Sequence, residues 1–146
     1  MKKLFMFLVL FSVLLCGCRA DADSDVSEYY EKLAKAQEIA VFAVDTETAV
    51  KTFTSKEDID GFVTALEIDE WELADLPQNA KEIGHFDFSQ EETLSLGQTE
   101  TDGNLYEVCK ITLYDGSFID FEIAGLRMSF EVTRDTADYL TGLLTQ

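Results

Sequence analysis

The chain is poor in the residues from which most catalytic and metal sites are built. Of its 146 residues, one is His, three are Cys, and 11 are Lys or Arg against 29 Asp or Glu. A single His argues against a catalytic zinc site, which needs three protein ligands. A net charge of −18 repels phosphate backbones and argues against nucleic-acid binding. The sequence also has no Gly-rich phosphate loop, Ser nucleophile elbow or kinase motif.

No apolar run is long enough to cross a membrane as a stable helix. The longest, Leu4 to Cys16, has 13 residues, whereas a transmembrane helix needs about 20. Lys2 and Lys3 precede this run, and small and acidic residues follow it at positions 19–25. A positively charged amino-terminal region, a short apolar run and small residues before a cleavage site indicate a secretory signal peptide.

The end of this segment, Leu15-Cys16-Gly17-Cys18, resembles the lipobox of bacterial lipoproteins. The resemblance implies cleavage before Cys18 and acyl chains, such as palmitate, held through a diacylglyceryl thioether on its sulfur. The alternative is an ordinary signal peptide, which would leave Cys18 as a free thiol. The lipobox predicts a protein anchored by lipid on the outer face of a cell membrane. In a two-membrane cell, Arg19 would favour the outer membrane.

The remaining chain is expected to form a tether, residues 18–25, and one domain, residues 26–146. Lys2 and Lys3 leave with residues 1–17, so the mature chain has nine basic and 29 acidic residues, a net charge of −20. Such a charge suits solubility or a basic protein partner. After cleavage and acylation, Cys109 is the one remaining thiol, so no internal disulfide is expected.

Residue periodicity predicts an α+β domain. Helical spacing predicts helices near residues 25–37, 56–69 and 134–145, the second capped by Ser55 with Asp58 three residues later. Period-two alternation predicts an antiparallel β-meander of about five to seven strands, covered on one face by two or three helices. The expected strands are residues 39–44, 49–53, 83–88, 93–99, 105–114, 118–123 and 126–132.

This order of segments is similar to that of small lipoproteins of Gram-positive bacteria. The resemblance covers residues 39–132 and includes the Ser55-Lys-Glu-Asp-Ile helix start and the connection around Trp71 and Pro77. Most such families have no assigned activity, so the resemblance implies a location and a fold but no reaction.

His85 and Asp87 are the main candidates for chemistry. They share one face of an expected strand, where they could transfer protons or form half of a metal site, or simply be exposed polar residues. Cys109 alternates with Leu105, Ile111 and Leu113, which predicts a buried, inert thiol; its pairing with His85 is the alternative. The carboxylates at Asp21–Asp25 and around Asp58 lack a complete calcium-loop pattern. We therefore expect no catalytic residues, metal or cofactor.

Four tyrosines are the candidates for a binding surface: Tyr29, Tyr30, Tyr106 and Tyr114. Tyr106, Val108 and Tyr114 alternate with Cys109, which places them on the opposite face of their strand. The leading functional hypothesis is a non-enzymatic module that binds a protein or ligand. The alternatives are an immunity or inhibitor protein for a basic exported enzyme or toxin, a small hydrolase using His85 and Asp87, and an accessory that presents a sheet edge.

Overall fold

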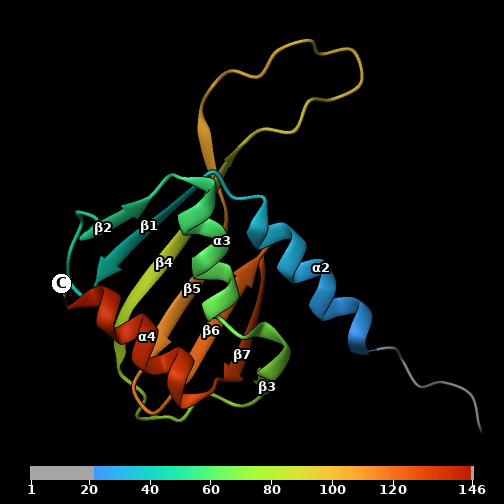
Figure 1. The fold of residues 1–146 in the computed structure, drawn as a ribbon. Helices are drawn as coiled ribbons and strands as arrows, with labels where there is room; N and C mark the ends of the chain where they lie inside the picture. The colour runs from blue at the N-terminus through green and yellow to red at the C-terminus, as the bar shows by residue number, and fades with distance from the viewer. Residues whose placement is uncertain (1–21, 146) are drawn as a thin grey trace, which may run out of the picture.

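The computed structural model describes residues 22–145, a seven-stranded sheet with helices packed on it (Figure 1). The predicted signal peptide and Cys18 lie outside the described residues. The elements are α2 (Ala22–Ala34), β1 (Glu38–Ala43), β2 (Lys51–Phe53), α3 (Lys56–Ala65), the 3-10 helix η2 (Ile68–Glu70), β3 (Glu72–Leu73), β4 (Glu82–Glu91), β5 (Leu105–Tyr114), β6 (Phe118–Ile123), β7 (Leu126–Glu131) and α4 (Arg134–Leu144).

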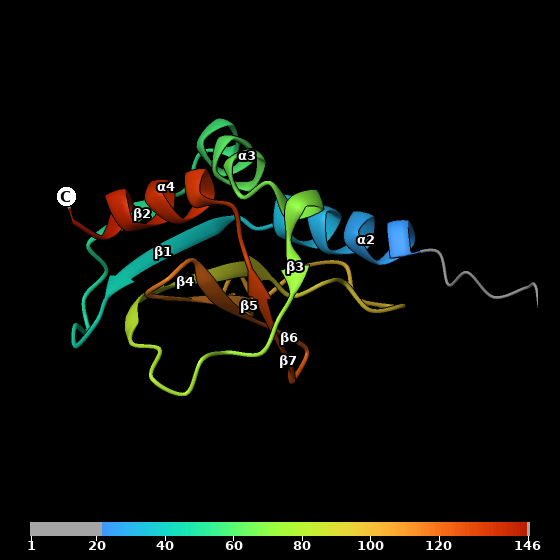
Figure 2. The ribbon, with the colours of Figure 1, turned by 90° about the horizontal axis from the view of Figure 1, so that it is seen from below.

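All neighbouring strands are antiparallel, in the order β2-β1-β4-β5-β6-β7-β3. Figure 2 shows α2, α3 and α4 on one side of the sheet, while the connection between β3 and β4 runs along one end of the strands, toward the other side (Figure 1). We call the side with the helices the helix face and the other side the open face. This arrangement confirms the predicted α+β class and its one-sided layer of helices.

Alternation along the central strands explains the two faces. In β4, Phe86 and Phe88 are buried on the helix face, while His85 and Asp87, which alternate with them along the strand, point to the open face. Ile111 in β5 lies opposite Phe86 and is also fully buried. Burying one such side chain contributes about 1.5–3 kcal/mol relative to leaving it in water.

Phe62 of α3 is the centre of this core. Its side chain is 1% exposed, and its ring contacts those of Phe53, Phe86, Phe88 and Tyr139 at centroid distances of 5.5 to 5.9 Å. Edge and tilted contacts of this kind add to the benefit of burial itself. One helical residue therefore joins β2, β4 and α4.

The predicted start of α3 is confirmed. The Ser55 hydroxyl oxygen accepts a hydrogen bond from the Asp58 backbone N–H at 3.1 Å, which satisfies one free amide at the helix start. The same hydroxyl donates to the Asp58 carboxylate at 2.7 Å. Asp58 therefore reaches back to the side chain of Ser55.

Several predicted boundaries differ from the structure, among them the end of α3, which lies at Ala65 rather than near residue 69. Residues 93–99 do not form a strand, because the pairing of β4 with β5 ends at Glu91 and Leu105 and the hairpin beyond leaves the sheet (Figure 1). The expected irregular connection contains β3, which pairs with the end of β7. Helix α2 begins at Ala22, within the segment expected to be a tether, and ends at Ala34 rather than at residue 37.

No helix among residues 22–145 combines the length and the apolar character needed to cross a membrane.

Candidate functional site

The open face carries a cluster of charged groups around His85. Its Nδ1 lies 3.5 Å from a carboxylate oxygen of Glu82, and its Nε2 lies 3.9 Å from Oδ2 of Asp87. The ring stacks on Phe42 of β1 at a centroid distance of 4.9 Å. The side chains of His85 and Asp87 are 25% and 19% exposed, so both are partly shielded from water. The predicted sharing of one face by His85 and Asp87 is confirmed.

Lys110 completes this cluster from the neighbouring strand. Its Nζ lies 3.4 Å from Oδ1 of Asp87 and 3.5 Å from Glu107. Partial burial works to lower the pKa of Lys110, but the two carboxylates outweigh it and hold the pKa above its usual value. Oδ1 of Asp87 is buried, and the contact with Lys110 does not have the geometry of a hydrogen bond. The cluster therefore places the carboxylates of Glu82 and Asp87 on either side of the His85 imidazole, with Lys110 beside Asp87.

A second polar group on the open face centres on Asp120 of β6. Only 6% of Asp120 is exposed, and its carboxylate accepts hydrogen bonds from Ser129 Oγ at 2.6 Å and from the Tyr114 hydroxyl at 3.2 Å. Burial, and then the negative charge of Asp120, raise the pKa of Tyr114. Sequence reasoning missed this group. The sequence feature that could have indicated this group is the alternation in β6, where Asp120 lies between the buried Ile119 and Phe121 and therefore faces away from the core.

A β-bulge at Val108 changes which side chains face the helices. Phe88 lies opposite Cys109 and Ser89 opposite Glu107, so β5 has one extra residue at this point. Beyond the bulge, Gln90 pairs with Tyr106. Cross-strand partners point to the same face, so Tyr106 lies on the helix face. The expectation that Tyr106 and Tyr114 share one face is therefore wrong.

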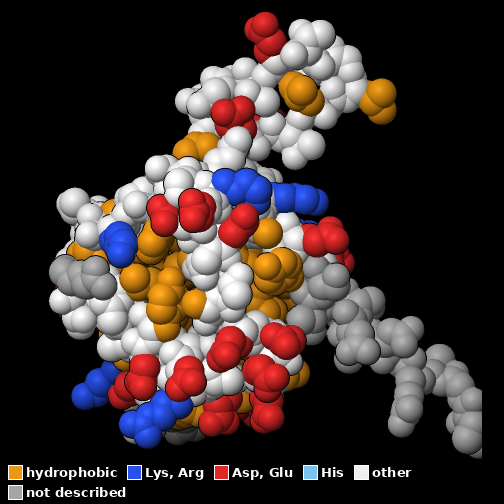
Figure 3. Space-filling model, viewed as in Figure 1, with side chains coloured by type: hydrophobic (Ala, Val, Ile, Leu, Met, Phe, Trp, Pro, Cys, Tyr) orange, Lys and Arg blue, Asp and Glu red, His pale blue; other side chains and the backbone are white. Residues whose placement is uncertain are grey.

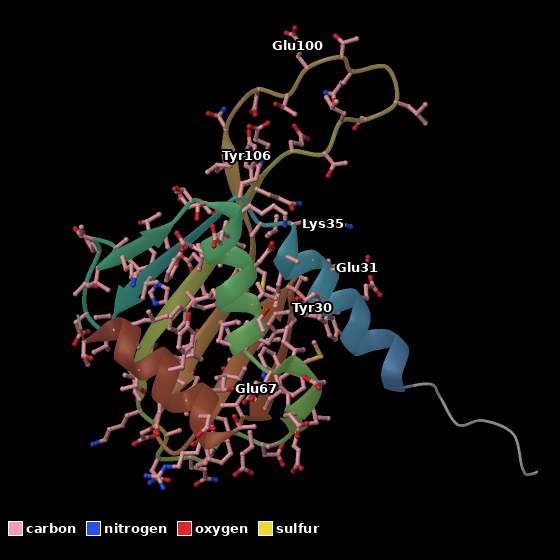
Figure 4. All side chains as sticks on the ribbon, viewed as in Figure 1. Tyr30, Glu31, Lys35, Glu67, Glu100 and Tyr106 are labelled. Carbon is pink, nitrogen blue, oxygen red and sulfur yellow. The ribbon has the colours of Figure 1, made fainter. Side chains whose placement is uncertain are left out.

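The four candidate tyrosines are accordingly divided between surfaces. Tyr29 packs against Phe121 beneath α2, with ring centroids 5.4 Å apart, and Tyr30 is 43% exposed on the same helix. Figure 4 shows Tyr106 at the base of the protruding hairpin, away from Tyr30. Tyr114 is on the open face with Asp120. The structure therefore does not bring the four together.

Cys109 is a buried residue of the helix face. It is 3% exposed and lies opposite Phe88, whereas His85 lies opposite Thr112 on the open face. Burial, followed by the charges of Glu107 and Asp87, raises the pKa of the thiol far above its usual range. A nucleophilic Cys needs the opposite shift and a base within reach. The alternative pairing of Cys109 with His85 is therefore contradicted by the structure.

A cavity of about 620 Å³ opens between the end of α2 and the sheet, next to the bulge. Lys32 lines it from α2 and Lys35 from the turn directly after that helix, and Val108 and Cys109 line it from β5. Its other walls include the end of β4 and the turn between β6 and β7. Figure 4 shows Lys35 at the end of α2 nearest the hairpin base. The volume is in the range of pockets that hold small organic ligands.

Within residues 22–145, no group of three or more His, Cys, Asp or Glu side chains has an arrangement that could hold a metal ion.

Comparisons with known proteins give one structural likeness. No protein-family model matches the chain, and no curated protein matches it. A crystal structure of a thioesterase-like protein from Clostridium sporogenes matches with a TM-score of 0.44 and 13% identity, over 76% of this chain and 95% of that one. A likeness of this size carries no argument for an activity of this chain.

The same comparison corrects the leading functional hypothesis. The sequence led us to expect a non-enzymatic binding module, with an immunity or inhibitor protein as one version of it. The matched protein is instead described as thioesterase-like. The comparison therefore gives no support to a non-enzymatic binding module, and we do not carry that hypothesis further as the function of the protein.

Proposed function

We propose that the protein is a bacterial lipoprotein, held by acyl chains on Cys18 at the extracytoplasmic face of a cell membrane. The observation that carries this proposal is the segment Leu15-Cys16-Gly17-Cys18 at the end of a short apolar run. Lys2 and Lys3 before that run supply the positive start of a signal peptide. Two or three acyl chains anchor a protein stably, whereas one chain binds only marginally.

The position of the folded domain is consistent with a short anchor. Helix α2 begins at Ala22, four residues after Cys18. Since an extended chain spans at most about 3.6 Å per residue, the Cα atom of Ala22 lies within about 14 Å of the Cα atom of the anchored Cys18. The mature charge of −20 is repelled by anionic headgroups, so the acyl chains must provide the attachment.

Metabolic labelling tests the proposal. Bacteria expressing the full chain are grown with an alkyne analogue of palmitate, and the labelled protein is then partitioned between detergent and water. The unmodified sequence is expected to take up label and enter the detergent phase. Cys18→Ser removes the acylated sulfur, so this variant is expected to lose the label and remain in water.

Two other cysteines provide matched controls. Cys16→Ser keeps a small residue before Gly17 and Cys18, so this variant should label as strongly as the unmodified chain. Cys109→Ala removes a buried thiol that the lipid does not use, and should label as well. Persistence of label and detergent partitioning in Cys18→Ser would show that the anchor is elsewhere.

A further inference from the structure

The cavity between α2 and the sheet has an apolar floor. Cys109 and Ile123 are 3% and 8% exposed and form part of the buried core. Val108, displaced by the bulge, is half-buried beside them, and Ala124 and Gly125 add a wall without polar side-chain atoms. Gln90 and Thr93 complete the lining with polar side chains. A hydrocarbon chain placed here would remove its own surface and that of Val108 from water, since Cys109 and Ile123 are already almost fully buried.

The glutamates that line the cavity direct their charge away from it. Glu122 lies opposite Lys110 and Arg127, which are on the open face, and its carboxylate is 2.7 Å from Arg127. The Glu107 carboxylate lies 3.5 Å from Lys110 on that same face. Both carboxylates are therefore paired with basic side chains on the open face of the sheet.

The charges on the helix side of the cavity are the ammonium groups of Lys32 and Lys35. Each makes an exposed pair with a residue one turn earlier, Lys32 with Glu28 at 2.8 Å and Lys35 with Glu31 at 3.9 Å. Exposed pairs of this type hold their partners weakly. A ligand with an acidic head group can therefore bind both ammonium groups, because little stability is lost when these two exposed pairs are broken. Figure 3 shows Lys or Arg side chains gathered where the hairpin leaves the body of this acidic protein.

We propose that this cavity binds an anionic amphiphile, with the hydrocarbon chain against Val108, Cys109 and Ile123 and the carboxylate or phosphate head at Lys32 and Lys35. The hydrocarbon chain matches the apolar floor of the cavity. The acidic head matches the two lysines at its rim, in a protein that otherwise carries a large excess of acidic residues. A free fatty acid and an anionic phospholipid share this chemistry, and the experiment distinguishes them.

The test is photo-crosslinking of the full chain in phosphatidylcholine nanodiscs. The three probes carry a diazirine in the acyl chain: a fatty acid, a phosphatidylglycerol and an uncharged monoacylglycerol. Mass spectrometry of the digested protein then locates the label. We expect label from one or both acidic probes on the peptides that contain residues 108–109 and 123–125. Label from phosphatidylglycerol identifies the membrane lipid as a source, and label from the fatty acid alone identifies the free amphiphile.

Three variants test the assigned groups. The double variant Lys32→Gln, Lys35→Gln should lower labelling at the cavity by about tenfold, because both cations that hold the head are lost. Lys56→Gln is the matched control: Lys56 is an exposed helical lysine with the same type of pair, 2.8 Å from Asp60, and should label like the unmodified chain. Val108→Trp should block labelling by filling the cavity, with circular dichroism confirming the fold.

Equal labelling by the uncharged probe, or unchanged labelling of the double lysine variant, would overturn the proposal. So would label confined to the exposed hairpin leucines, Leu94 and Leu96. The intact mass of the reconstituted chain shows whether Cys18 is acylated, and the crosslinked peptides show whether the cavity binds the probe. The two proposals are therefore tested by separate measurements. Failure of one proposal is therefore distinguishable from failure of the other.

Discussion

Replacing Ser129 by Ala is predicted to destabilise the domain, because Asp120 would lose one of its two hydroxyl donors. Ser129 Oγ donates to Asp120 at 2.6 Å, and Asp120 is only 6% exposed, so water cannot readily replace the donor. Hydrogen bonds to charged groups contribute about 1.5–3 kcal/mol. The remaining bond from Tyr114 is longer, at 3.2 Å. We therefore expect the free energy of unfolding to fall by about 2 kcal/mol.

Urea denaturation followed by the fluorescence of Trp71 measures this change. Trp71 packs against Phe121 and Phe130, so its emission reports loss of the core. Ser89→Ala is the control, since Ser89 lies on the open face and its hydroxyl makes no hydrogen bond among the described residues. Its effect should stay within about 0.5 kcal/mol, as for most surface changes. Equal midpoints for the two variants would refute the assignment of Asp120 as a buried, hydroxyl-bound carboxylate.

Three further predictions concern the core, a helix cap and alkaline pH. Phe62→Ala should cost about 3–5 kcal/mol in urea, against less than about 0.5 for the exposed Leu96→Ala; similar losses would contradict the core assignment. Ser55→Ala should cost about 1 kcal/mol by the same assay, and no loss would contradict the cap. Because the pKa of Tyr114 is raised, its contribution to stability is complete below about pH 10 and is lost at higher pH. The free energy of unfolding of Tyr114→Phe should therefore fall less steeply than that of the unmodified chain as pH rises above about 10, and parallel pH profiles would contradict this.

Local chemistry was enough to predict most of the sheet. The turn at Ala124 and Gly125 has positive φ at both residues, as a two-residue type I′ hairpin requires, and it joins β6 to β7 as expected. The predicted turn at Asp115 and Gly116 also joins two strands, although the positive φ angles fall on Gly116 and Ser117. These features depend on neighbouring residues, which a single sequence displays directly.

Features that depend on distant partners were not predictable in this way. Residues 93–99 alternate like a strand, but no strand lies beside them to complete their hydrogen bonds. The bulge at Val108 follows from how β5 aligns with β4, and one extra residue was enough to move Tyr106 to the helix face. The two residues of β3 form a strand only because the end of β7 pairs with them.

The same distinction holds for the candidate site. His85 and Asp87 are two residues apart on one strand, so their shared face followed from alternation alone. The contact of Lys110 with Asp87 and those of Tyr114 and Ser129 with Asp120 need the register of neighbouring strands. The cavity further requires the packing of α2 over the sheet, which no local pattern indicates.

The most direct test of the central proposal is the mass of the amino-terminal peptide of the mature protein. Protein extracted from membranes of the native bacterium is digested, and its first peptide is sequenced by tandem mass spectrometry. The proposal predicts a peptide that begins at Cys18 and carries a diacylglyceryl group on its sulfur. A peptide that begins at another residue, or an unmodified Cys18, would contradict it.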